Sequence, residues 1–252
     1  MTARLEGCVA LVTGASSGIG AATAAELAAQ GSRVVLAARR AGRLAEVADR
    51  IAAAGGGVRV LEADIARRGV PAQLVADAVA AEGRLDILVN AAGVMLNGNS
   101  IDRPLSEWEQ MVDLNLMALL AITKAALPHL VEAAKGPRGV ADVVNVSSVA
   151  GRVAAATAGV YNATKFGVNG FSEALRQEFA RRNVRVSVVE PGAVRTELFD
   201  HQAPVAQARL SRILAEVEYL HPEDVAETIA HIITRPRRVA LAEVVVRPTD
   251  HI

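Results

Sequence analysis

The sequence predicts an α/β fold in which a doubly wound parallel sheet of about seven strands carries helices on both faces. Short β-branched runs alternate with longer Ala- and Leu-rich amphipathic stretches, as in strand–helix repeats with right-handed crossovers. The runs are apolar at nearly every position, which is typical of strands covered on both faces. A length of 252 residues without a break in composition fits one domain, 1–252, with a large buried core.

The predicted elements follow one another along the whole chain. The strand candidates are residues 9–13, 33–38, 58–62, 87–90, 142–147, 184–189 and 244–247. The helix candidates lie near residues 19–30, 41–54, 70–82, 106–135, 158–182 and 222–234. Ser106 and Glu109 have the spacing of a capping box at the start of the fourth helix, and Pro222 stands where the first residue of the last helix is expected.

The segment 198–219 has a weaker pattern than the rest and comes late, after a strand. Two interpretations stay open for it. It is either a substrate-binding flap within the single domain or an ordinary surface helix.

Composition excludes several classes of function. Lys+Arg and Asp+Glu number 27 each, and aromatic residues make up 3%, so neither a charged field nor stacking surfaces for nucleic acid are expected. The five histidines show no metal-ligand spacing, and the single cysteine, Cys8, has no partner for a disulfide. Without a signal peptide or an uninterrupted apolar run of about 20 residues, we expect a soluble cytoplasmic protein that binds no membrane.

A glycine-rich turn joins the first strand to the first helix. Residues 13–20 read TGASSGIG, with Gly14, Gly18 and Gly20 in a Gly-x3-Gly-x-Gly spacing. Residues without Cβ let the backbone approach a diphosphate closely, and a helix N-terminus offers N–H groups and partial positive charge to the anion. The first strand–helix joint of an open sheet is where nucleotides bind. The turn therefore predicts a dinucleotide site.

The end of the second strand indicates which dinucleotide is used. Enzymes selective for NAD place a carboxylate there to hold the ribose 2′-hydroxyl, but this chain has Ala38 followed by Arg39 and Arg40. Guanidinium groups suit a 2′-phosphate, so NADP(H) is favoured over NAD(H). Asp64, at the end of the third strand, is expected to touch the adenine.

Tyr161 and Lys165 form the candidate proton-transfer pair. A separation of four residues places them one turn apart on the same face of the helix candidate 158–182. A nearby ammonium lowers the pKa of a phenol, about 10 in water, toward a useful range. The chain holds three lysines against 24 arginines and only two tyrosines, which argues against an ordinary surface pair.

A hydroxyl donor is expected at the end of the fifth strand. Asn145, Ser147 and Ser148 stand there, thirteen to sixteen residues before Tyr161, and such strand ends are where open sheets bind ligands. A serine hydroxyl at this edge could stabilise charge on a substrate carbonyl oxygen, and spacing favours Ser148.

Together these motifs resemble the short-chain dehydrogenase/reductase family, whose sheet is Rossmann-like. The resemblance rests on the glycine turn, on 90–93 (NAAG), and on Asn115, Ser148, the Tyr161/Lys165 pair and 191–192 (PG), in the family's order and approximate spacing. It covers essentially the whole chain. More loosely, 166–173 (FGVNGFSE) and 247–250 (RPTD) resemble the bacterial NADP-dependent hydroxy-acid and clavulanate dehydrogenase group.

The resemblance implies a role for each matching residue. Tyr161 would be the general acid/base, Lys165 would lower its pKa and bind the nicotinamide ribose, Ser148 would orient the carbonyl, and Asn115 would hold a water linked to Lys165. Ala91 departs from a common second asparagine. The expected cofactor contacts are Gly14, Ser16, Ser17, Gly18, Ile19, Arg39, Arg40, Asp64, Ile65, Asn90, Ala91, Gly93, Tyr161, Lys165, Pro191, Gly192, Val194 and Thr196.

The expected activity is an NADP(H)-dependent oxidoreductase acting on a small carbonyl or secondary alcohol. Two alternatives are a catalytically silent NADP(H)-binding regulator and an epimerase or dehydratase on the same scaffold. The long helices 106–135 and 158–182 are apolar over more than one face, and the family commonly associates through them. We expect a homotetramer, with a dimer second.

Overall fold

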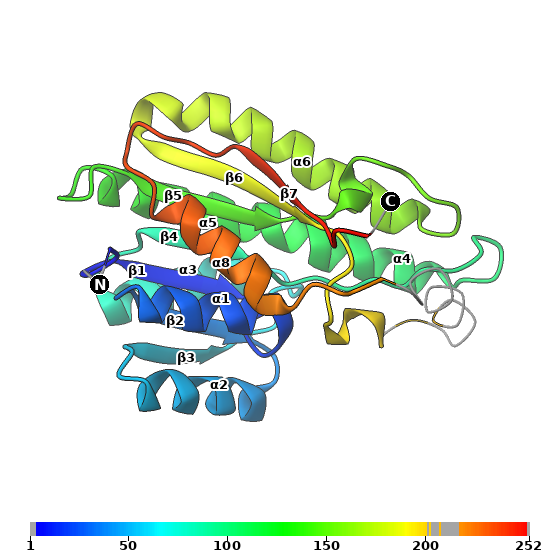
Figure 1. The fold of residues 1–252 in the computed structure, drawn as a ribbon, viewed down its shortest axis with the longest axis horizontal. Coiled ribbons are helices and arrows are strands. Elements are labelled where there is room, and N and C mark those ends of the chain that lie inside the picture. Colours follow the sequence, from blue (N-terminus) through cyan, green and yellow to red (C-terminus); the bar gives the residue numbers. More distant parts are fainter. Residues whose placement is uncertain (1–3, 201, 203–206, 208–216, 251–252) are drawn as a thin grey trace.

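Seven parallel strands form one sheet in the part of the chain that the structure describes, in the order β3-β2-β1-β4-β5-β6-β7 (Figure 1). The structure is a computed structural model that describes residues 4–200, 202, 207 and 217–250. The strands are β1 (Val9–Thr13), β2 (Arg33–Ala38), β3 (Val58–Glu62), β4 (Ile87–Asn90), β5 (Ala141–Val146), β6 (Val184–Pro191) and β7 (Glu243–Val246). The predicted doubly wound sheet is confirmed.

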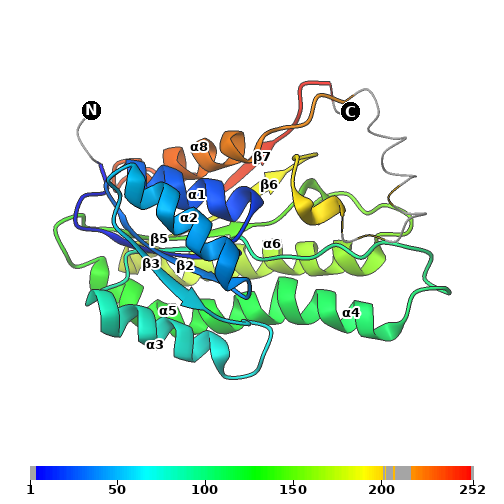
Figure 2. The same ribbon diagram turned by 90° about the horizontal axis from the view of Figure 1, so that it is seen from below.

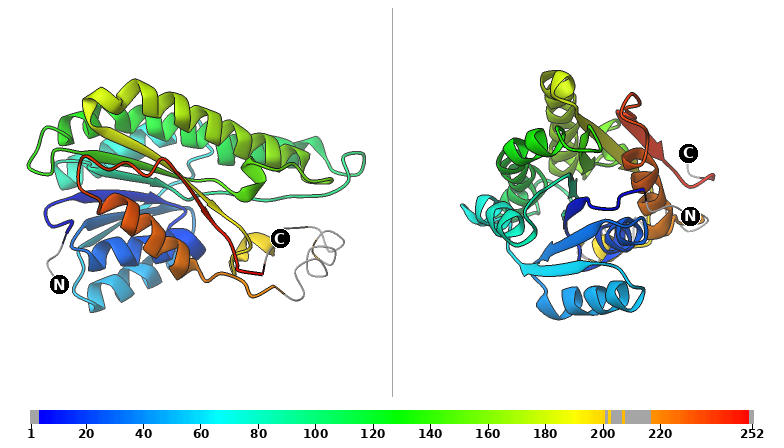
Figure 3. Two further views of the ribbon diagram at one scale, coloured as in Figure 1. Left: turned by 45° about the horizontal axis from the view of Figure 1, so that its top comes forward. Right: turned by 90° about the vertical axis from the view of Figure 1, so that its left-hand side faces the viewer.

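Helices cover both faces of this sheet (Figures 2 and 3). They are α1 (Gly18–Ala29), α2 (Ala41–Ala53), α3 (Val70–Glu82), α4 (Leu105–Val112), α5 (Ala118–Ala133), α6 (Gly159–Phe179) and α8 (Pro222–Ile233). One core cluster lies under α1, α2 and α8, and a second lies under α3, α5 and α6. Because the sheet is covered twice, β1, β4, β5 and β6 are buried at every position, whereas the edge strands β3 and β7 are partly exposed.

The fourth predicted helix contains a π-helical turn, and its predicted capping box is wrong. A π-helical turn, Asp113–Met117, separates α4 from α5. The N-cap residue is Pro104, which has extended backbone angles, and no side chain caps the helix. Since Leu105 is already helical, Ser106 lies inside the first turn and cannot form the expected capping box. Pro222, by contrast, begins α8 as predicted.

The continuous helix Leu105–Ala133 is long and apolar enough to cross a membrane by length and composition, with a mean hydropathy of 1.5. Polar side chains on its inner side argue for a core helix. Asn115 and Thr123 are almost fully buried and hydrogen-bonded to other elements. Only 39% of its most apolar stretch is buried, however, so much of its apolar surface faces outward.

The order of the strands reverses between β1 and β4, which are neighbours in the sheet. Because all strands are parallel, the turn after β1 and the segment after β4 leave the same edge side by side. The two connections then continue to opposite faces of the sheet, which opens a crevice between them. This edge carries the candidate site.

Candidate active site

A cleft of about 270 Å³ lies along the carboxyl edge of the sheet. It brings together sequence-predicted residues from seven separate segments of the chain. The predicted residues that line it are Gly14, Ser16, Ser17, Gly18, Ile19, Arg39, Arg40, Asp64, Ile65, Ala91, Gly93, Ser148, Tyr161, Lys165, Pro191, Gly192, Val194 and Thr196. Asn90 and Asn115 are the two predicted site residues that do not line it, and both are buried behind its wall.

The glycine turn forms the floor of one end of the cleft. Gly14 has φ +67°, and a Cβ there would lie 2.8 Å from backbone atoms of Ala92, so no side chain fits. Helix α1 begins at Gly18 with no acidic residue in its first turn, and the N-cap Ser17 makes no side-chain cap bond. The first N–H groups of a helix lack intrahelical partners and favour an anion. This end fits a diphosphate.

Arg40 spans the same end of the cleft. Its guanidinium donates to Ser16 Oγ at 3.0 Å and Ser17 Oγ at 2.7 Å, and it pairs with Glu197 at 2.7 Å. Arg40 thereby holds the pKa of the Glu197 carboxyl below its usual value. Arg39 lines the cleft beside it and is exposed. Strand β2 ends at Ala38, so no carboxylate occupies the position typical of NAD-selective proteins.

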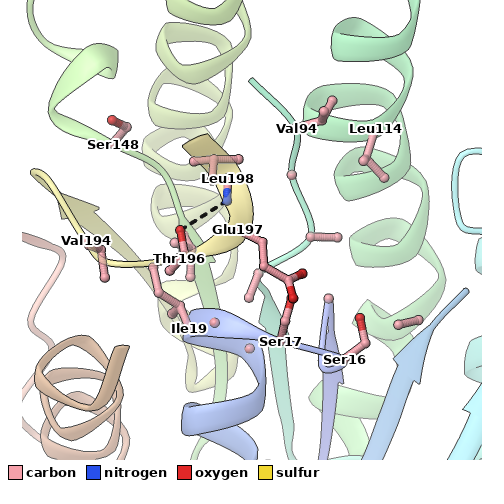
Figure 4. A pocket seen from close by; sticks show the side chains of 18 of the residues that line it. Ser16, Ser17, Ile19, Val94, Leu114, Ser148, Val194, Thr196, Glu197 and Leu198 are labelled. Atoms are coloured by element: carbon pink, nitrogen blue, oxygen red, sulfur yellow. Dashed lines mark hydrogen bonds between the residues drawn. The ribbon is translucent and has the colours of Figure 1, made fainter. Parts of the chain in front are cut away.

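Glu197 was missed by sequence reasoning. It follows Thr196 directly, in a short 3₁₀ turn, and its carboxylate faces Ser17 across the cleft (Figure 4). Nothing in the local sequence distinguishes it from a surface glutamate. Its role depends on a contact with Arg40, 157 residues away in the chain.

The segments after β3 and β4 complete the wall. The Asp64 carboxylate accepts from the Ala66 N–H at 3.3 Å. The Asn90 side chain points inward and donates to Thr123 Oγ1 at 3.1 Å and to Asn145 Oδ1 at 2.8 Å. Ala91 lines the cleft and its N–H donates to Thr13 Oγ1. The backbone is therefore held in place although Ala91 stands where a second asparagine is common.

Asn115 stands in the π-helical turn, and its side chain clamps the main chain of Val94. It accepts from the Val94 N–H and donates to the Val94 carbonyl, both at 2.8 Å, and also contacts Thr164 Oγ1 at 3.4 Å. A Cβ at Gly93 would lie 3.4 Å from Asn115 Oδ1 and 3.9 Å from Lys165 Nζ. Asn115 and Lys165 therefore border Gly93 together.

Tyr161 and Ser148 meet at the other end of the cleft. Tyr161 is 5% exposed, and burial raises the pKa of its phenol to about 12. A hydrogen bond with Ser148 acts in the opposite direction and lowers that pKa. The Ser148 oxygen also accepts from the Ala150 N–H at 3.1 Å, which fixes the serine at the start of a 3₁₀ turn.

Lys165 is buried beside this pair. Its Nζ donates to the Val146 carbonyl at 2.9 Å and lies 5.7 Å from the centre of the Tyr161 ring. Burial lowers the pKa of Lys165 to about 8. Desolvation disfavours the charge on each side chain. The lowering of the phenol pKa by Lys165 stays a prediction.

Apolar side chains surround the reacting end. Tyr161 packs in a cluster with Val94, Met95 and Met111, against which Leu198 and Phe199 lie. The Phe199 ring stands edge-on to Tyr219 with centroids 6.0 Å apart. Both ends of the candidate flap 198–219 thus lie at the site, while residues 201, 203–206 and 208–216 fall outside the described residues. The choice between flap and surface helix stays open.

Comparison with known proteins gives consistent matches. A family model described as short chain dehydrogenase matches residues 8–205. A glycine betaine reductase of Emericella nidulans is 37% identical over 246 residues, 98% of this chain; the chain spans only 19% of that protein's length. An uncharacterized oxidoreductase of Staphylococcus aureus is 33% identical over 240 residues, covering 95% of this chain and 96% of the relative.

Solved structures share the fold over nearly the full chain. A metagenomic short-chain oxidoreductase crystallised with NADP superposes with a TM-score of 0.82 at 34% identity, covering 98% of this chain and 99% of the other. The closed form of a serine dehydrogenase complexed with NADP+ has a TM-score of 0.85 at 31% identity, with 94% of each chain covered.

Lys165 should leave a signature in the pH dependence of stability. The unfolded chain binds a proton on Lys165 up to a pKa of 10.5, but the folded protein only up to about 8. Raising the pH through this window therefore removes a proton from the unfolded state and favours folding. We expect the unfolding free energy of the protein, relative to Lys165→Met, to rise by as much as about 3 kcal/mol across it.

Denaturant titrations at several pH values measure this difference. Lys124→Met makes the same substitution at an exposed lysine of α5 and should show no such rise. If the difference in unfolding free energy did not change with pH for either variant, Lys165 would be charged in the folded protein across the whole pH window.

Proposed function

The chain belongs to the short-chain dehydrogenase/reductase family, and we propose that it is an NADP(H)-dependent oxidoreductase that moves hydride between nicotinamide and the carbonyl or alcohol carbon of a small substrate. One observation carries the proposal. Tyr161, Ser148 and Lys165 converge at one end of a cleft whose other end combines a glycine turn, a helix N-terminus and arginines.

The dinucleotide is proposed to lie along the cleft with its diphosphate over the glycine turn. The close approach at Gly14 and the uncapped start of α1 support this placement. Arg39 and Arg40 at the end of β2, with no carboxylate there, support a 2′-phosphate and hence NADP(H). The NADP complexes of related proteins agree with this choice. When bound, the cofactor donates or accepts the hydride.

Residues of this chain would donate the proton and stabilise the charge on the substrate oxygen. In the reducing direction Tyr161, protonated at neutral pH, gives its proton to the carbonyl oxygen as the carbon gains hydride, which yields the alcohol. Ser148 donates a hydrogen bond to the same oxygen and stabilises its developing charge. Lys165 would hold the ribose hydroxyls. The main-chain carbonyl of Asn115 would hold the linking water, because its amide is committed to Val94.

The surroundings of Tyr161 favour a neutral, partly apolar substrate. Val94, Met95, Met111 and Leu198 offer no charge to a carboxylate. Arg152, whose guanidinium could otherwise bind the carboxylate of an acidic substrate, is instead paired with two glutamates of this chain. Among the described residues that line the cleft, Arg39 and Arg40 lie at the adenosine end, and Lys165 donates to the Val146 carbonyl and is assigned to the ribose hydroxyls. A hydroxy-acid substrate, suggested by the resemblance to hydroxy-acid dehydrogenases, therefore stays a prediction, and turnover of a panel of substrates tests it.

Self-association is proposed through the outer face of α4, the π-helical turn and α6. Leu105, Met117 and Phe166 are 65%, 52% and 45% exposed, and a group of exposed large apolar side chains is typical of a protein–protein contact. The turn and α6 pack directly together, since a Cβ at Gly167 would lie 3.3 Å from Leu116. A second copy covering this face would bury it, in a dimer or in the expected homotetramer.

Turnover of ketones and oxo acids, followed by NADPH absorbance, tests the activity. Tyr161→Phe should lower kcat at least about 100-fold, because the proton donor is lost, while NADPH affinity stays nearly unchanged. Tyr219→Phe removes the chain's other phenol hydroxyl and should keep most of the turnover. Retained turnover in Tyr161→Phe would refute the proposed chemistry. Cofactor binding without turnover of any substrate would indicate a regulator, and product without net cofactor change an epimerase.

Arg39→Ala tests the 2′-phosphate. A charge-assisted hydrogen bond is worth about 1.5–3 kcal/mol, so NADPH should bind about 10- to 100-fold more weakly while NADH binding changes little. Calorimetric titration of both cofactors measures the difference. Arg43→Ala, at an exposed arginine of α2 paired with Glu46, is the control. Equal losses for NADPH and NADH would remove Arg39 from phosphate recognition.

Phe166→Glu tests the interface. A buried unpaired carboxylate opposes association, so the variant should have a smaller mass than the native protein by light scattering at equal concentration. Val60→Glu introduces the same charge at an exposed apolar position on β3, at the far edge of the sheet, and should keep the native mass. An unchanged mass for Phe166→Glu would exclude this face.

A further inference from the structure

A fully buried carboxylate lies behind the reacting end of the cleft. Glu190 is the next-to-last residue of β6, is 0% exposed and stands among apolar strand residues. A carboxylate is costly to bury and is stable there only when hydrogen-bonded and paired. Its oxygens accept from Arg152 Nε at 2.5 Å and from Asn169 Nδ2 at 2.6 Å. Each of these partners belongs to an element that carries a candidate catalytic residue.

Arg152 connects Glu190 to the turn that holds Ser148. It directly follows the 3₁₀ turn Val149–Gly151, of which Ser148 is the N-cap residue. The same guanidinium reaches a second carboxylate, that of Glu243 on β7, which is 46% exposed. One arginine thereby ties the serine turn to β6 and β7.

Asn169 connects Glu190 to α6. It stands one turn after Lys165, and its Nδ2 also donates to the Gly151 carbonyl at 3.1 Å. The turn and the helix are in close contact at this point, since a Cβ at Gly151 would lie 2.8 Å from Asn169 Nδ2 and 3.0 Å from the Lys165 carbonyl. The Glu190 carboxylate is therefore the common anchor of the serine turn and of the helix that bears Tyr161.

We propose that Glu190 is a positioning residue that sets the placement of Ser148 against Tyr161. It is not among the described residues that line the cleft, so it acts through Arg152 and Asn169. With the anchor in place, the Ser148 hydroxyl is held within hydrogen-bonding reach of the phenol. Without it, the turn and α6 lose their shared support and the serine–tyrosine hydrogen bond loosens. The kinetic part of this inference rests on the proposed function.

The Arg152 guanidinium pairs with two carboxylates, and substitutions of these carboxylates form a matched pair of variants. Glu190→Gln and Glu243→Gln make the same chemical change, one on the buried carboxylate and one on the exposed carboxylate. The glutamine of Glu190→Gln keeps an oxygen for Asn169 but turns an N–H donor toward Arg152, which opposes the contact. Glu243→Gln leaves the buried anchor intact. A second variant, Asn169→Ala, removes the hydrogen bond between α6 and Glu190 but keeps the Arg152–Glu190 ion pair. It takes the place of Glu190→Gln in the test if that variant does not fold.

The first measurement is NMR of the protein labelled with carbon-13 at tyrosine Cζ, whose shift reports the hydrogen bonding of the phenol. Only two tyrosines are present, so Tyr161→Phe assigns the signal, and Ser148→Ala marks its position without the serine bond. We expect Glu190→Gln and Asn169→Ala to move the Tyr161 resonance toward the Ser148→Ala position. Glu243→Gln should leave it in place.

The second measurement is steady-state kinetics with NADPH binding in parallel. Glu190→Gln should lower kcat about tenfold with the Kd of NADPH unchanged, a smaller loss than the 10²–10³ that follows outright removal of an oxyanion donor. Glu243→Gln should keep kcat. A Tyr161 resonance at the native position in both anchor variants, or equal kcat in the two glutamine variants, would overturn the proposal. If the native protein turned over no carbonyl, the proposed function would fail while the NMR arm would still test the anchor.

Discussion

Exclusion of water from Tyr161 and Lys165 is the constraint on which the rest of the site depends. Burial favours the neutral form of each side chain, raising the phenol pKa to about 12 and lowering the ammonium pKa to about 8. The hydrogen bond from Ser148 is the influence that acts the other way on the phenol. In the proposed mechanism, a change in the position of that serine would therefore alter proton transfer, and this is why the proposed anchor at Glu190 would matter.

The cleft separates charge from apolar surface along its length. The glycine turn and Arg40 form a positive end, where the Arg40 guanidinium is already paired with Glu197. Residues such as Val94 and Met111 form an apolar end around the phenol. A bound dinucleotide would place its phosphates at the first end and its reactive ring at the second. The same low-dielectric surroundings that shift the pKa values would strengthen hydrogen bonds to a reacting carbonyl.

The helix Leu105–Ala133 serves both the site and the surface. Asn115, in its π-helical turn, fixes the backbone of Val94 at the cleft wall. The opposite side bears Met117, which together with Phe166 on α6 leaves apolar surface uncovered in the single chain. A local departure from α-helical geometry thus places an amide inward at the one point where the wall needs it.

The sequence by itself determined the seven-stranded parallel sheet, the positions of the helices to within a few residues and most of the predicted cleft residues, because periodicity, glycine spacing and the Tyr161/Lys165 separation are local signals. Tertiary structure decided what depends on partners distant in the chain. The anchoring of Arg152 by Glu190, the pairing of Arg40 with Glu197 and the burial that raises the Tyr161 pKa join segments from different strands and helices. Desolvation and ion pairing act through space, so no local pattern of residues could have revealed them.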